Sequence, residues 1–562
     1  MMWKKRGSYE NLDEYYLGNL GVASYDDINN WFVKHYAHNY RIDRLDEAVE
    51  LAKKYKDKAI RIIGDYDADG INSTSILYLG FKWAGYKNVK YRIPKRFSEG
   101  FGINETIIDE IIDEIDEGLI ITCDNGLAQT KAIKKAKDHG FEVIILDHHL
   151  PETDCGLVID SPADIVIDPS AYPDTADFSG YCGAGLCYKF AEILLDYDKT
   201  KTTKLLTLAA VGTVADVMEI REENYVIVRN GLKYMKNFQT TVPGLYAILS
   251  LASENTKNKK DLLKYVTSTD IGFTIGPVIN AASRMDDIGA NYVIEILTYE
   301  GPYENILESV KNLYDVNNMR KELQTNAIET AKEVIEEKWD GKTAPLVLYL
   351  PGVHEGILGI IAGQIAESYR VPCFVLSDSE DPSKMKGSAR SYGDYNVKEN
   401  MDNVSRYLFV YGGHTGAGGL TVEKKNFENF KKAIQEVSKD FVVGEEEEIQ
   451  YYDIEINASQ IPDTIKKLDS LEPFGEGNPR PVFCIKNFEM IRKFGNYKQI
   501  MGKDMSTVKL FSKNADAIGI HLAEGFKFLD EPKTLDFLGD VEDNRYKDNV
   551  THQVKFIDYQ MH

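Results

Sequence analysis

Aspartate and histidine residues recur in four short stretches of this sequence, and three of these stretches directly follow a β-rich apolar run. They are Asp65, Asp67 and Asp69 in DYDADG, Asp124 in CDNG, Asp147, His148 and His149 in LDHH, and Asp216 late in an apolar helical stretch. Carboxylate oxygens suit Mg²⁺ and Mn²⁺, and an added imidazole favours Mn²⁺. Clustered carboxylates repel one another unless cations neutralise them. Two such ions can polarise a phosphate, activate a water and stabilise the leaving oxygen. The pattern predicts a two-metal site for phosphate chemistry.

Each stretch could also have a purely structural role when it is taken alone. DYDADG is similar to a calcium-binding loop, although no Glu follows at the EF-hand spacing. Asp124, followed by Asn and Gly, could simply form a turn. Asp216 is different, because an aspartate buried without a partner costs several kcal/mol, which favours a ligand role. The four stretches together are far more specific than any one of them.

Strand-like runs alternate with helical patterns around these residues. The runs are AIRIIG (59–64), LIITCDNG (119–126), EVIILDHH (142–149) and ADIVIDPS (163–170). This alternation predicts βαβ units and a parallel sheet. Functional residues of such sheets gather at the carboxyl ends of the strands, where these Asp and His residues fall. Two helical stretches follow, at 183–197 and 201–218.

The sequence pattern of the rest of the chain predicts two further domains, so the fold class is an α/β protein of several domains. We expect a helical lead-in at 1–45, a catalytic domain at 46–300, a connector helix at 301–340, a smaller α/β domain at 341–443 and a small β-barrel at 450–562. The acidic run at 444–450 is expected to be a linker, because adjacent like charges gain nothing from packing together.

Composition narrows the class of protein. The net charge is −23, from 66 basic and 89 acidic residues, which argues against a protein that coats duplex nucleic acid. A local exception lies between Lys486 and Lys509, where basic residues alternate with Phe488, Phe494 and Tyr497. These rings either stack on bases of a single strand or face the core of an ordinary hairpin.

Cellular location is constrained by three further features. The six cysteines form no CxxC pair, which suits a reducing compartment. No apolar run approaches the roughly 20 residues that span a bilayer, and no apolar stretch follows the basic start. We expect a cytoplasmic protein with no membrane partner.

In their order, DYDADG, CDNG, LDHH and GTVADVM resemble the metal-binding motifs of the DHH phosphoesterase superfamily, and GGHTGAGG (412–419) resembles the signature loop of the associated DHHA1 domain. Further strings are similar to segments of the RecJ single-strand-specific exonucleases: IPKRFSEGFG, YCGAGLCYKF, GFTIGPVINAASRM, KGSARS and LEPFGEGNPRPVF. The resemblance runs from about residue 58 to about 485, and the tail resembles the oligonucleotide-binding (OB) barrel of RecJ proteins.

The resemblance implies a role for each matching residue. The implied metal ligands are Asp65, Asp67, Asp124, His148 and Asp216, with Asp124 bridging two Mn²⁺ or Mg²⁺ ions. His149 would face the scissile phosphate, while Asp69 and Asp147 would support the ligands. Phosphate contacts are implied for Arg96, Arg284, Ser388, Arg390, Gly413 and His414. The chain departs from the family pattern at Ser283, where Gly is usual, and at Ala417-Gly418-Gly419, where Ala-Ala-Gly is usual.

The activity implied by the resemblance is hydrolysis of single-stranded DNA from its 5′ end to 5′-mononucleotides, in DNA repair or recombination, by a monomer served by a helicase and a single-strand-binding protein. One alternative is a DHH phosphodiesterase acting on short oligonucleotides, cyclic dinucleotides or pyrophosphate. The tail and the IPKRFSEGFG loop argue against it. A second alternative is a non-catalytic scaffold, which should have lost metal ligands that this chain retains.

Overall fold

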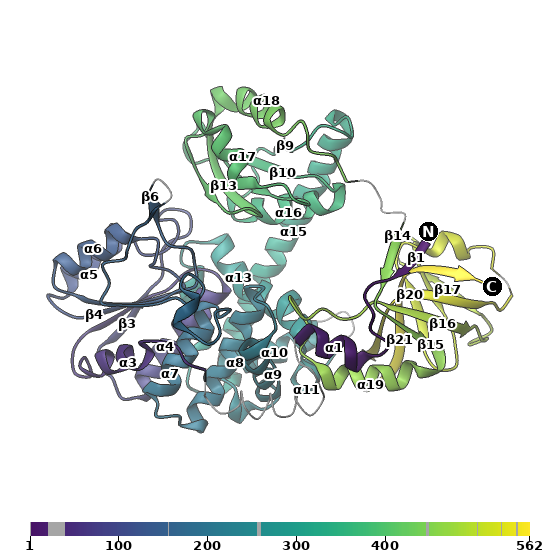
Figure 1. Ribbon diagram of the computed structural model, residues 1–562, viewed down its shortest axis with the longest axis horizontal. Coiled ribbons are helices and arrows are strands. Elements are labelled where there is room, and N and C mark those ends of the chain that lie inside the picture. The colour runs from purple at the N-terminus through teal and green to yellow at the C-terminus, as the bar shows by residue number, and fades with distance from the viewer. Residues whose placement is uncertain are drawn as a thin grey trace. The chain divides into compact units, whose positions relative to one another are not determined.

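The computed structural model describes residues 2–20, 40–154, 157–255, 260–444, 449–502, 504–529, 531–546 and 549–562 (Figure 1). The chain divides into two compact units. Unit 1 comprises Met1–Asn280, Ala290–Lys311 and Ile449–His562, and unit 2 comprises Ala281–Gly289 and Asn312–Glu448. The predicted catalytic domain and the predicted C-terminal domain therefore belong to the same unit.

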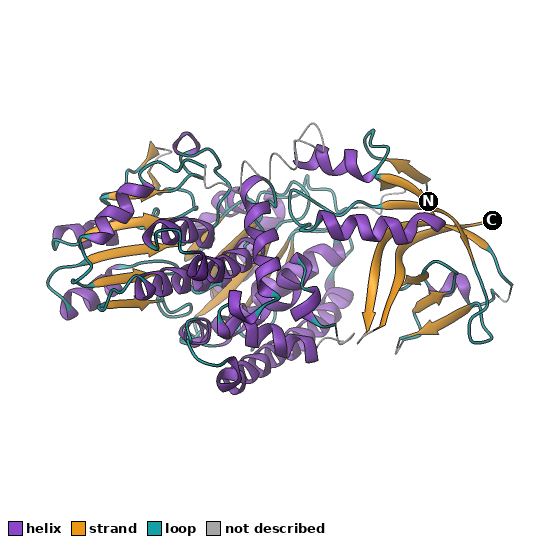
Figure 2. Cartoon of the chain, turned by 90° about the horizontal axis from the view of Figure 1, so that it is seen from below, coloured by secondary structure: helices purple, strands orange, loops and turns teal. Residues whose placement is uncertain are grey.

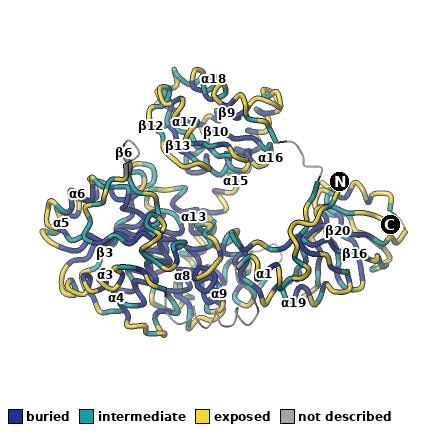
Figure 3. The backbone as a smooth tube through the Cα atoms, in the orientation of Figure 1, coloured by how far each residue is buried: buried dark blue, intermediate teal, exposed yellow. Residues whose placement is uncertain are grey.

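Unit 1 is built on a five-stranded sheet in the order β3-β2-β4-β5-β8, and every neighbouring pair is parallel. Its strands are β2 (Ile60–Ile63), β3 (Val89–Arg92), β4 (Leu119–Cys123), β5 (Glu142–Leu146) and β8 (Ile165–Ile167). All residues of β2 and β4 are buried, as expected for a parallel sheet covered on both faces (Figure 3). The predicted parallel α/β domain is confirmed.

Helices cover both faces of this sheet (Figure 1). They are α3 (Leu45–Lys53), α4 (Ala68–Trp83) and α7 (Gly183–Leu194) on one face, and α5 (Glu105–Glu114) and α6 (Thr130–Asp138) on the other. On α5, Ile107, Ile108 and Ile111 are buried, and this spacing places one apolar stripe against the sheet. A short hairpin, β6 (Thr153–Asp154) and β7 (Leu157–Val158), precedes β8.

A group of helices completes the catalytic part of the chain. They are α8 (Lys199–Ala215), α9 (Glu222–Met235), α10 (Pro243–Asn255), α11 (Leu262–Tyr265), α12 (Ser268–Asp270), the π-helix η3 (Ile271–Ile275), α13 (Gly276–Met285) and α14 (Gly289–Leu297). The expected apolar helix before Asp216 is α8. The sequence pattern places Asp216 inside this helix. The helix instead ends at Ala215, and Asp216 is its half-buried C-cap.

The predicted connector is confirmed as a single helix, α15 (Leu307–Lys338), which leads into the sheet of unit 2. That sheet has the order β12-β13-β11-β10-β9. Its strands are β9 (Leu346–Tyr349), β10 (Cys373–Asp378), β11 (Lys384–Arg390), β12 (Val410–Gly413) and β13 (Ala417–Glu423). Within this sheet the β9–β10 pair is parallel and the other pairs are antiparallel.

Alternate residues of β9 enter different cores, as the two-residue period of a strand requires. Leu346 and Leu348 pack in one core with α15 and α16 (Leu358–Tyr369), and Val347 packs in the other with α18 (Phe427–Val437). A shorter helix, α17 (Val397–Asn403), also borders the second core.

The C-terminal domain is a seven-stranded sheet in the order β15-β16-β20-β21-β19-β18-β17, with helix α19 (Ile461–Leu471) (Figure 2). Its strands are β15 (Ile454–Asn457), β16 (Phe483–Glu489), β17 (Lys498–Met501), β18 (Thr507–Leu510), β19 (Asp516–Gly519), β20 (Thr534–Tyr546) and β21 (Asn549–Met561). The tail predicted to be a small β-barrel is thus confirmed as a β-domain, and in the described residues it forms one seven-stranded sheet whose outermost strands are β15 and β17. None of the helices in the described ranges combines the length and apolar character needed to span a bilayer.

The lead-in predicted to be helical begins instead with a strand. β1 (Met2–Lys5) pairs in parallel with β14 (Ile449–Tyr452), and Arg6 binds Asp453 through two hydrogen bonds of 2.8 and 2.9 Å. A helix, α1 (Leu12–Leu20), follows. The partner strand is supplied 447 residues further along the chain, so local sequence carries no sign of it. Most of the predicted acidic linker, residues 445–448, lies outside the described residues.

Candidate metal and phosphate sites

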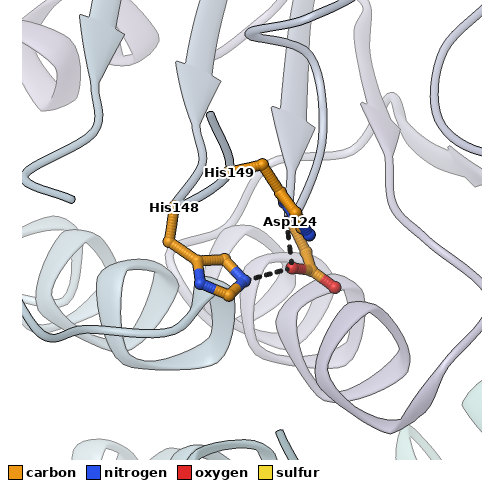
Figure 4. A group of neighbouring side chains, drawn as sticks. All are labelled: Asp124, His148 and His149. Carbon is orange, nitrogen blue, oxygen red and sulfur yellow. Dashed lines mark hydrogen bonds and ion pairs between the residues drawn. The ribbon is translucent and has the colours of Figure 1, made fainter. Parts of the chain in front are cut away.

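The predicted ligands meet at the carboxyl edge of the parallel sheet. Asp65 follows β2, Asp124 follows β4, and the LDHH histidines follow β5. The Nε2 atom of His148 lies 3.0 Å from Oδ1 of Asp124, and Nδ1 of His149 lies 4.0 Å from the same oxygen (Figure 4). Asp124 itself has a φ of 61°, a left-handed conformation that is uncommon for residues other than glycine.

Three overlapping groups of side chains each bring their ligand atoms within 4.8 Å of one another. The groups are Asp65–Asp67–Asp124, Asp69–His148–Asp216 and Asp124–His148–His149. All five residues predicted as metal ligands are therefore brought together. Asp124 belongs to two of the groups, as a residue shared by two ions should.

The DYDADG loop is shaped by short contacts within itself. Asp67 is the N-cap of α4, and its Oδ1 accepts hydrogen bonds from the backbone N–H groups of Asp69 (3.0 Å) and Gly70 (3.1 Å). A Cβ at Gly70 would lie 2.6 Å from the backbone carbonyl of Asp65. The glycine lets α4 begin directly against the strand end, which is the physical reason for a Gly at the end of this motif.

Asp69 connects the loop to two helices. Its carboxylate accepts hydrogen bonds from the N–H groups of Gly183 (2.7 Å) and Ala184 (3.0 Å), the first residues of α7. Free N–H groups at a helix N-terminus stabilise a carboxylate. A Cβ at Gly212 of α8 would lie 2.6 Å from Oδ1 of Asp69. Asp69 thus packs against the helix that ends beside Asp216, and its supporting role stays a prediction, since Asp69 also belongs to a possible ligand group with His148 and Asp216.

Asp147 orients the LDHH loop. Its carboxylate accepts hydrogen bonds from Nδ1 of His149 (2.8 Å) and from the N–H groups of Leu127 (3.0 Å) and His148 (2.8 Å). Burial lowers the pKa of His149, but the hydrogen bond and the charge of Asp147 outweigh burial and raise that pKa to about 9. The histidine that Asp147 orients is therefore His149, which carries a proton at neutral pH.

The acidic residues of the cluster are crowded and largely buried, which disfavours their ionised forms. Burial, followed by repulsion from neighbouring carboxylates, raises the pKa of Asp65 and Asp124 well above the usual value and that of Asp216 to about 8. Oδ1 of Asp65 is buried without a hydrogen-bond partner among the described residues. Burial lowers the pKa of His148, which keeps its imidazole neutral and able to act as a ligand. These donors fit hard divalent cations.

Aromatic and basic side chains from the IPKRFSEGFG loop border this cluster. The guanidinium of Arg96 lies 4.7 Å from the ring centre of Tyr66, the residue between Asp65 and Asp67. The ring of Phe101 meets that of His149 edge to face, with centroids 5.2 Å apart, and 42% of Phe101 is exposed. Arg96 therefore lies beside the DYDADG loop, and its contact with a phosphate stays a prediction. Phe101 was not predicted.

Asp168 is a second residue that sequence reasoning missed. It follows β8, the outermost strand of the sheet beside β5. It is buried, and its Oδ2 lacks a hydrogen-bond partner among the described residues. Burial, with the nearby charge of Asp147, raises its pKa to about 8. The rule that places functional residues at strand ends could have identified Asp168, because ADIVIDPS is recognisable as a strand.

In unit 2 the predicted phosphate-binding residues lie on adjoining strands and a hairpin. Nη1 of Arg390 donates to Oγ of Ser388 (3.0 Å), and both residues belong to β11. β11 pairs with β13, which forms a hairpin with β12, and Gly413 and His414 lie at its turn. A Cβ at Gly359 of α16 would lie 2.8 Å from Nη2 of Arg390. The backbone therefore approaches this guanidinium closely.

Glycines also shape the turn of this hairpin and the surroundings of Arg284. Gly413 has a φ of 146°, and a Cβ there would lie 2.3 Å from the carbonyl oxygen of Ala417. Arg284, the remaining predicted phosphate contact, donates from Nη1 to the carbonyl oxygen of Gly356 (3.3 Å), directly before α16.

The basic segment of the C-terminal domain agrees only in part with a base-stacking surface. Phe488 is fully buried and packs on Phe537, so the core alternative is correct for this ring. Phe494 is 95% exposed. Several lysines are paired with acids, as in Lys486–Asp536 at 2.9 Å and Lys493–Asp516 at 2.7 Å, which reduces the basic character that the sequence suggests.

Comparison with known proteins agrees with this geometry. The chain matches the DHH family N-terminal domain at residues 59–213, the DHHA1 domain at 343–440 and the RecJ OB domain at 452–558. The single-stranded-DNA-specific exonuclease RecJ of Bacillus subtilis is 28% identical over 520 residues, which is 92% of this chain and 62% of that protein. This chain thus spans less than two thirds of that relative.

Two further proteins extend the comparison. A putative single-strand DNA-specific exonuclease of Bacillus phage SPbeta, yorK, is 26% identical over 97% of this chain and 95% of its own length. The crystal structure of RecJ from Thermus thermophilus in complex with Mn²⁺ has a TM-score of 0.74 at 24% identity, covering 92% of this chain and 72% of that one. At this identity the likeness establishes the fold. The chain therefore carries a DHH domain, a DHHA1 domain and a RecJ OB domain in this order, and it is similar to RecJ exonucleases over most of its length.

Proposed function

We propose that this protein is a metal-dependent exonuclease that hydrolyses single-stranded DNA from the 5′ end to 5′-mononucleotides. The observation that carries the proposal is the convergence of Asp65, Asp67, Asp124, His148 and Asp216 at one sheet edge. The Bacillus subtilis relative and the phage relative are both named as exonucleases specific for single-stranded DNA, which supports that substrate for this protein. The 5′ polarity is what the family resemblance implies.

The ligands divide naturally between two cations. Asp65 and Asp67 would hold one ion, His148 and Asp216 the other, and Asp124 would touch both, in keeping with its place in two of the clusters. When bound, a pair of Mn²⁺ or Mg²⁺ ions supplies a nucleophilic water and neutralises charge on the phosphate. The imidazole among the ligands favours Mn²⁺.

The chain's own residues would orient the phosphate. His149 is held by Asp147 in a protonated state and can donate a hydrogen bond to a phosphate oxygen. Arg96, which lies over the ring of Tyr66 in the DYDADG loop, can donate a second one. The exposed ring of Phe101 beside His149 offers an apolar surface to the nucleotide base.

The residues of unit 2 would hold the phosphate of the terminal nucleotide. Arg390 offers a planar fork of donors with the Ser388 hydroxyl beside it, and the Gly413–His414 turn permits close approach of an anion to the backbone. The C-terminal domain would bind the strand further from the cut. Monomeric state, cytoplasmic location, a helicase and a single-strand-binding protein as partners, and a role in DNA repair or recombination complete the proposal.

The test is release of nucleotides from long single strands labelled at either end, with Mn²⁺, Mg²⁺ or chelator. We expect labelled mononucleotide from the 5′ end at once, and none with chelator or on blunt duplex. Inertness on long strands with turnover of dinucleotides or pyrophosphate would assign the site to another DHH activity. Binding without any cleavage would make the protein a scaffold, an outcome disfavoured by the complete ligand set.

A further inference from the structure

The LEPFGEGNPRP motif has no role in the proposed chemistry, yet it is extensively bonded to the catalytic part of unit 1. We infer that the segment Leu471–Arg480, called here the 471–480 segment, is a positioning element for the metal site. It helps to fix the position of Asp216 and that of the DYDADG loop. The inference rests on the proposed metal site. It adds residues that lie in another domain and touch no ligand directly.

The first connection leads to Asp216. The backbone N–H of Ile220 donates to the carbonyl oxygen of Glu476 (2.7 Å), and Nε of Arg221 donates to that of Gly477 (2.7 Å). Both bonds join the 471–480 segment to the turn between α8 and α9, four and five residues after Asp216. A Cβ at Gly475 would lie 2.8 Å from Cγ1 of Ile220, so the backbone at Gly475 packs closely against the Ile220 side chain.

The turn between Asp216 and Ile220 is bonded back to α8 at its start, where the N–H groups of Val217 and Met218 donate to the carbonyl oxygens of Val214 (3.2 Å) and Thr213 (3.1 Å). Val217 adopts a φ of 57° and is 66% exposed, which leaves it with little packing. Asp216 is held on its N-terminal side by α8, through the bond from its N–H to Gly212. The bonds to the 471–480 segment supply the restraint on the other side. Outer contacts of this kind orient metal ligands and commonly affect metal affinity.

The second connection leads to the DYDADG loop. Oγ of Ser268 donates to the carbonyl oxygen of Phe474 (2.5 Å). Ser268 begins a continuous helical stretch formed by α12, η3 and the start of α13, which carries Asn280. Oδ1 of Asn280 accepts from the N–H of Ala68 (2.8 Å), the residue between Asp67 and Asp69. One segment is thus bonded to both sides of the ligand cluster.

The 471–480 segment is itself a rigid turn. Gly475 and Asn478 exchange two backbone hydrogen bonds of 3.0 and 3.1 Å, and the fully buried Asn478 side chain donates to the carbonyl oxygen of Pro473 (2.9 Å). Arg480 then ties the turn to β20, donating to Asp540 (2.9 Å) and to the carbonyl oxygen of Val541 (3.0 Å). The C-terminal domain is therefore connected to the metal site through specific bonds.

The experiment removes one connection at a time and measures Mn²⁺ binding by calorimetry without DNA. Arg221→Met deletes the donor to Gly477, and Ser268→Ala deletes the donor to Phe474. Ser470→Ala is the matched control, because its exposed hydroxyl bonds within α19, to the carbonyl oxygen of Lys467 (2.7 Å). Thermal unfolding in chelator reports any general loss of stability.

We expect Mn²⁺ affinity to fall for each variant and by roughly 10-fold in the double variant, the lower end of the range for residues outside the ligand shell. Saturating Mn²⁺ should restore the rate of cleavage, and the unfolding temperature in chelator should stay at the wild-type value. The control variant Ser470→Ala should keep wild-type Mn²⁺ affinity. The Arg221 side chain is 44% exposed, so its replacement tests the idea even if Ser268→Ala folds poorly.

Wild-type Mn²⁺ affinity in a folded double variant would overturn the inference. An equal loss of affinity in Ser470→Ala would overturn it as well. The outcome is separable from the fate of the proposed function. A wild-type protein that binds Mn²⁺ but cuts no DNA, with weaker Mn²⁺ binding in the variants, would refute the exonuclease and keep the positioning role. Normal cleavage with unchanged Mn²⁺ binding in the variants would refute the positioning role and keep the exonuclease.

Discussion

The Oδ1 atom of Asp124 lies 3.0 Å from Nε2 of His148, and the two residues stand at the carboxyl ends of neighbouring parallel strands, β4 and β5. A carboxylate and a half-buried, neutral imidazole at this distance can form one edge of a cation site. Because Asp124 also belongs to the cluster with Asp65 and Asp67, its loss removes a ligand from both proposed ions.

Asp124→Ala should therefore abolish cleavage, with a loss greater than the roughly 10–100-fold typical of residues outside the ligand shell. Single-strand binding by the C-terminal domain should persist, since that domain does not contain Asp124. Cleavage rate and strand binding are measured on the same preparation. Asp138→Ala, on the exposed surface of α6, is the control and should cut normally. Near-normal cleavage by Asp124→Ala would refute the bridging assignment.

Asp147→Asn tests how His149 is held. The hydrogen bond and charge of Asp147 raise the pKa of His149 to about 9 against the opposing effect of burial. With the charge removed, burial should prevail and the pKa should fall, so the imidazole loses its proton as the pH rises through a lower value. Nuclear magnetic resonance of the metal-free protein follows this titration. An unchanged pKa would show that another group holds the proton.

Gly183→Ala tests the packing of α7 against the site. The added Cβ would lie 2.7 Å from Cβ of Asp124 and 3.0 Å from Oδ2 of Asp69. Overpacking of this kind costs about 1–3 kcal/mol, which denaturant unfolding can measure. Gly272→Ala is the control, because its Cβ meets only a methyl group of Val214 at an ordinary 3.7 Å among the described residues. Equal stability of the two variants would contradict the close approach.

Arg390→Lys tests the terminal-phosphate role of unit 2. Lysine keeps the charge but loses the planar fork. Hydrogen bonds to charged groups contribute about 1.5–3 kcal/mol, so the KM for 5′-phosphorylated strands should rise roughly 10- to 100-fold. Strands with a 5′-hydroxyl should be affected little. A similar change in KM for both kinds of strand would place the phosphate elsewhere.

Asp536 should make the C-terminal domain sensitive to acid. Burial raises its pKa, but hydrogen bonds from Lys486 (2.9 Å) and from the N–H of Asn487 (2.9 Å) outweigh burial and lower it. A depressed folded-state pKa stabilises the domain above the unfolded-state value, and this stabilisation is lost as the pH falls through the folded-state value. Asp536→Asn should therefore flatten the decline in stability below about pH 4. Urea unfolding at several pH values checks it, and an unchanged slope would contradict the prediction.

The sequence alone predicted the candidate ligands and the sheet that presents them. Apolar runs that end in Asp or His, several times in one chain, are typical of a site at a sheet edge, and the strand-end rule for parallel sheets places their side chains together. The same rule applies to Asp168, which directly follows β8. The sequence indicates this strand, but the motif pattern does not include Asp168.

Only the tertiary structure decided contacts between residues distant in the chain. Tertiary packing decided that Asp147 holds His149 and that Phe488, but not Phe494, is buried. It also decided that Asp216 lies just beyond the end of α8. The pairing of β1 with β14 has no local signal, because each strand is completed by residues hundreds of positions away. Types and spacing of residues fix the chemistry available, whereas packing fixes which groups meet to perform it.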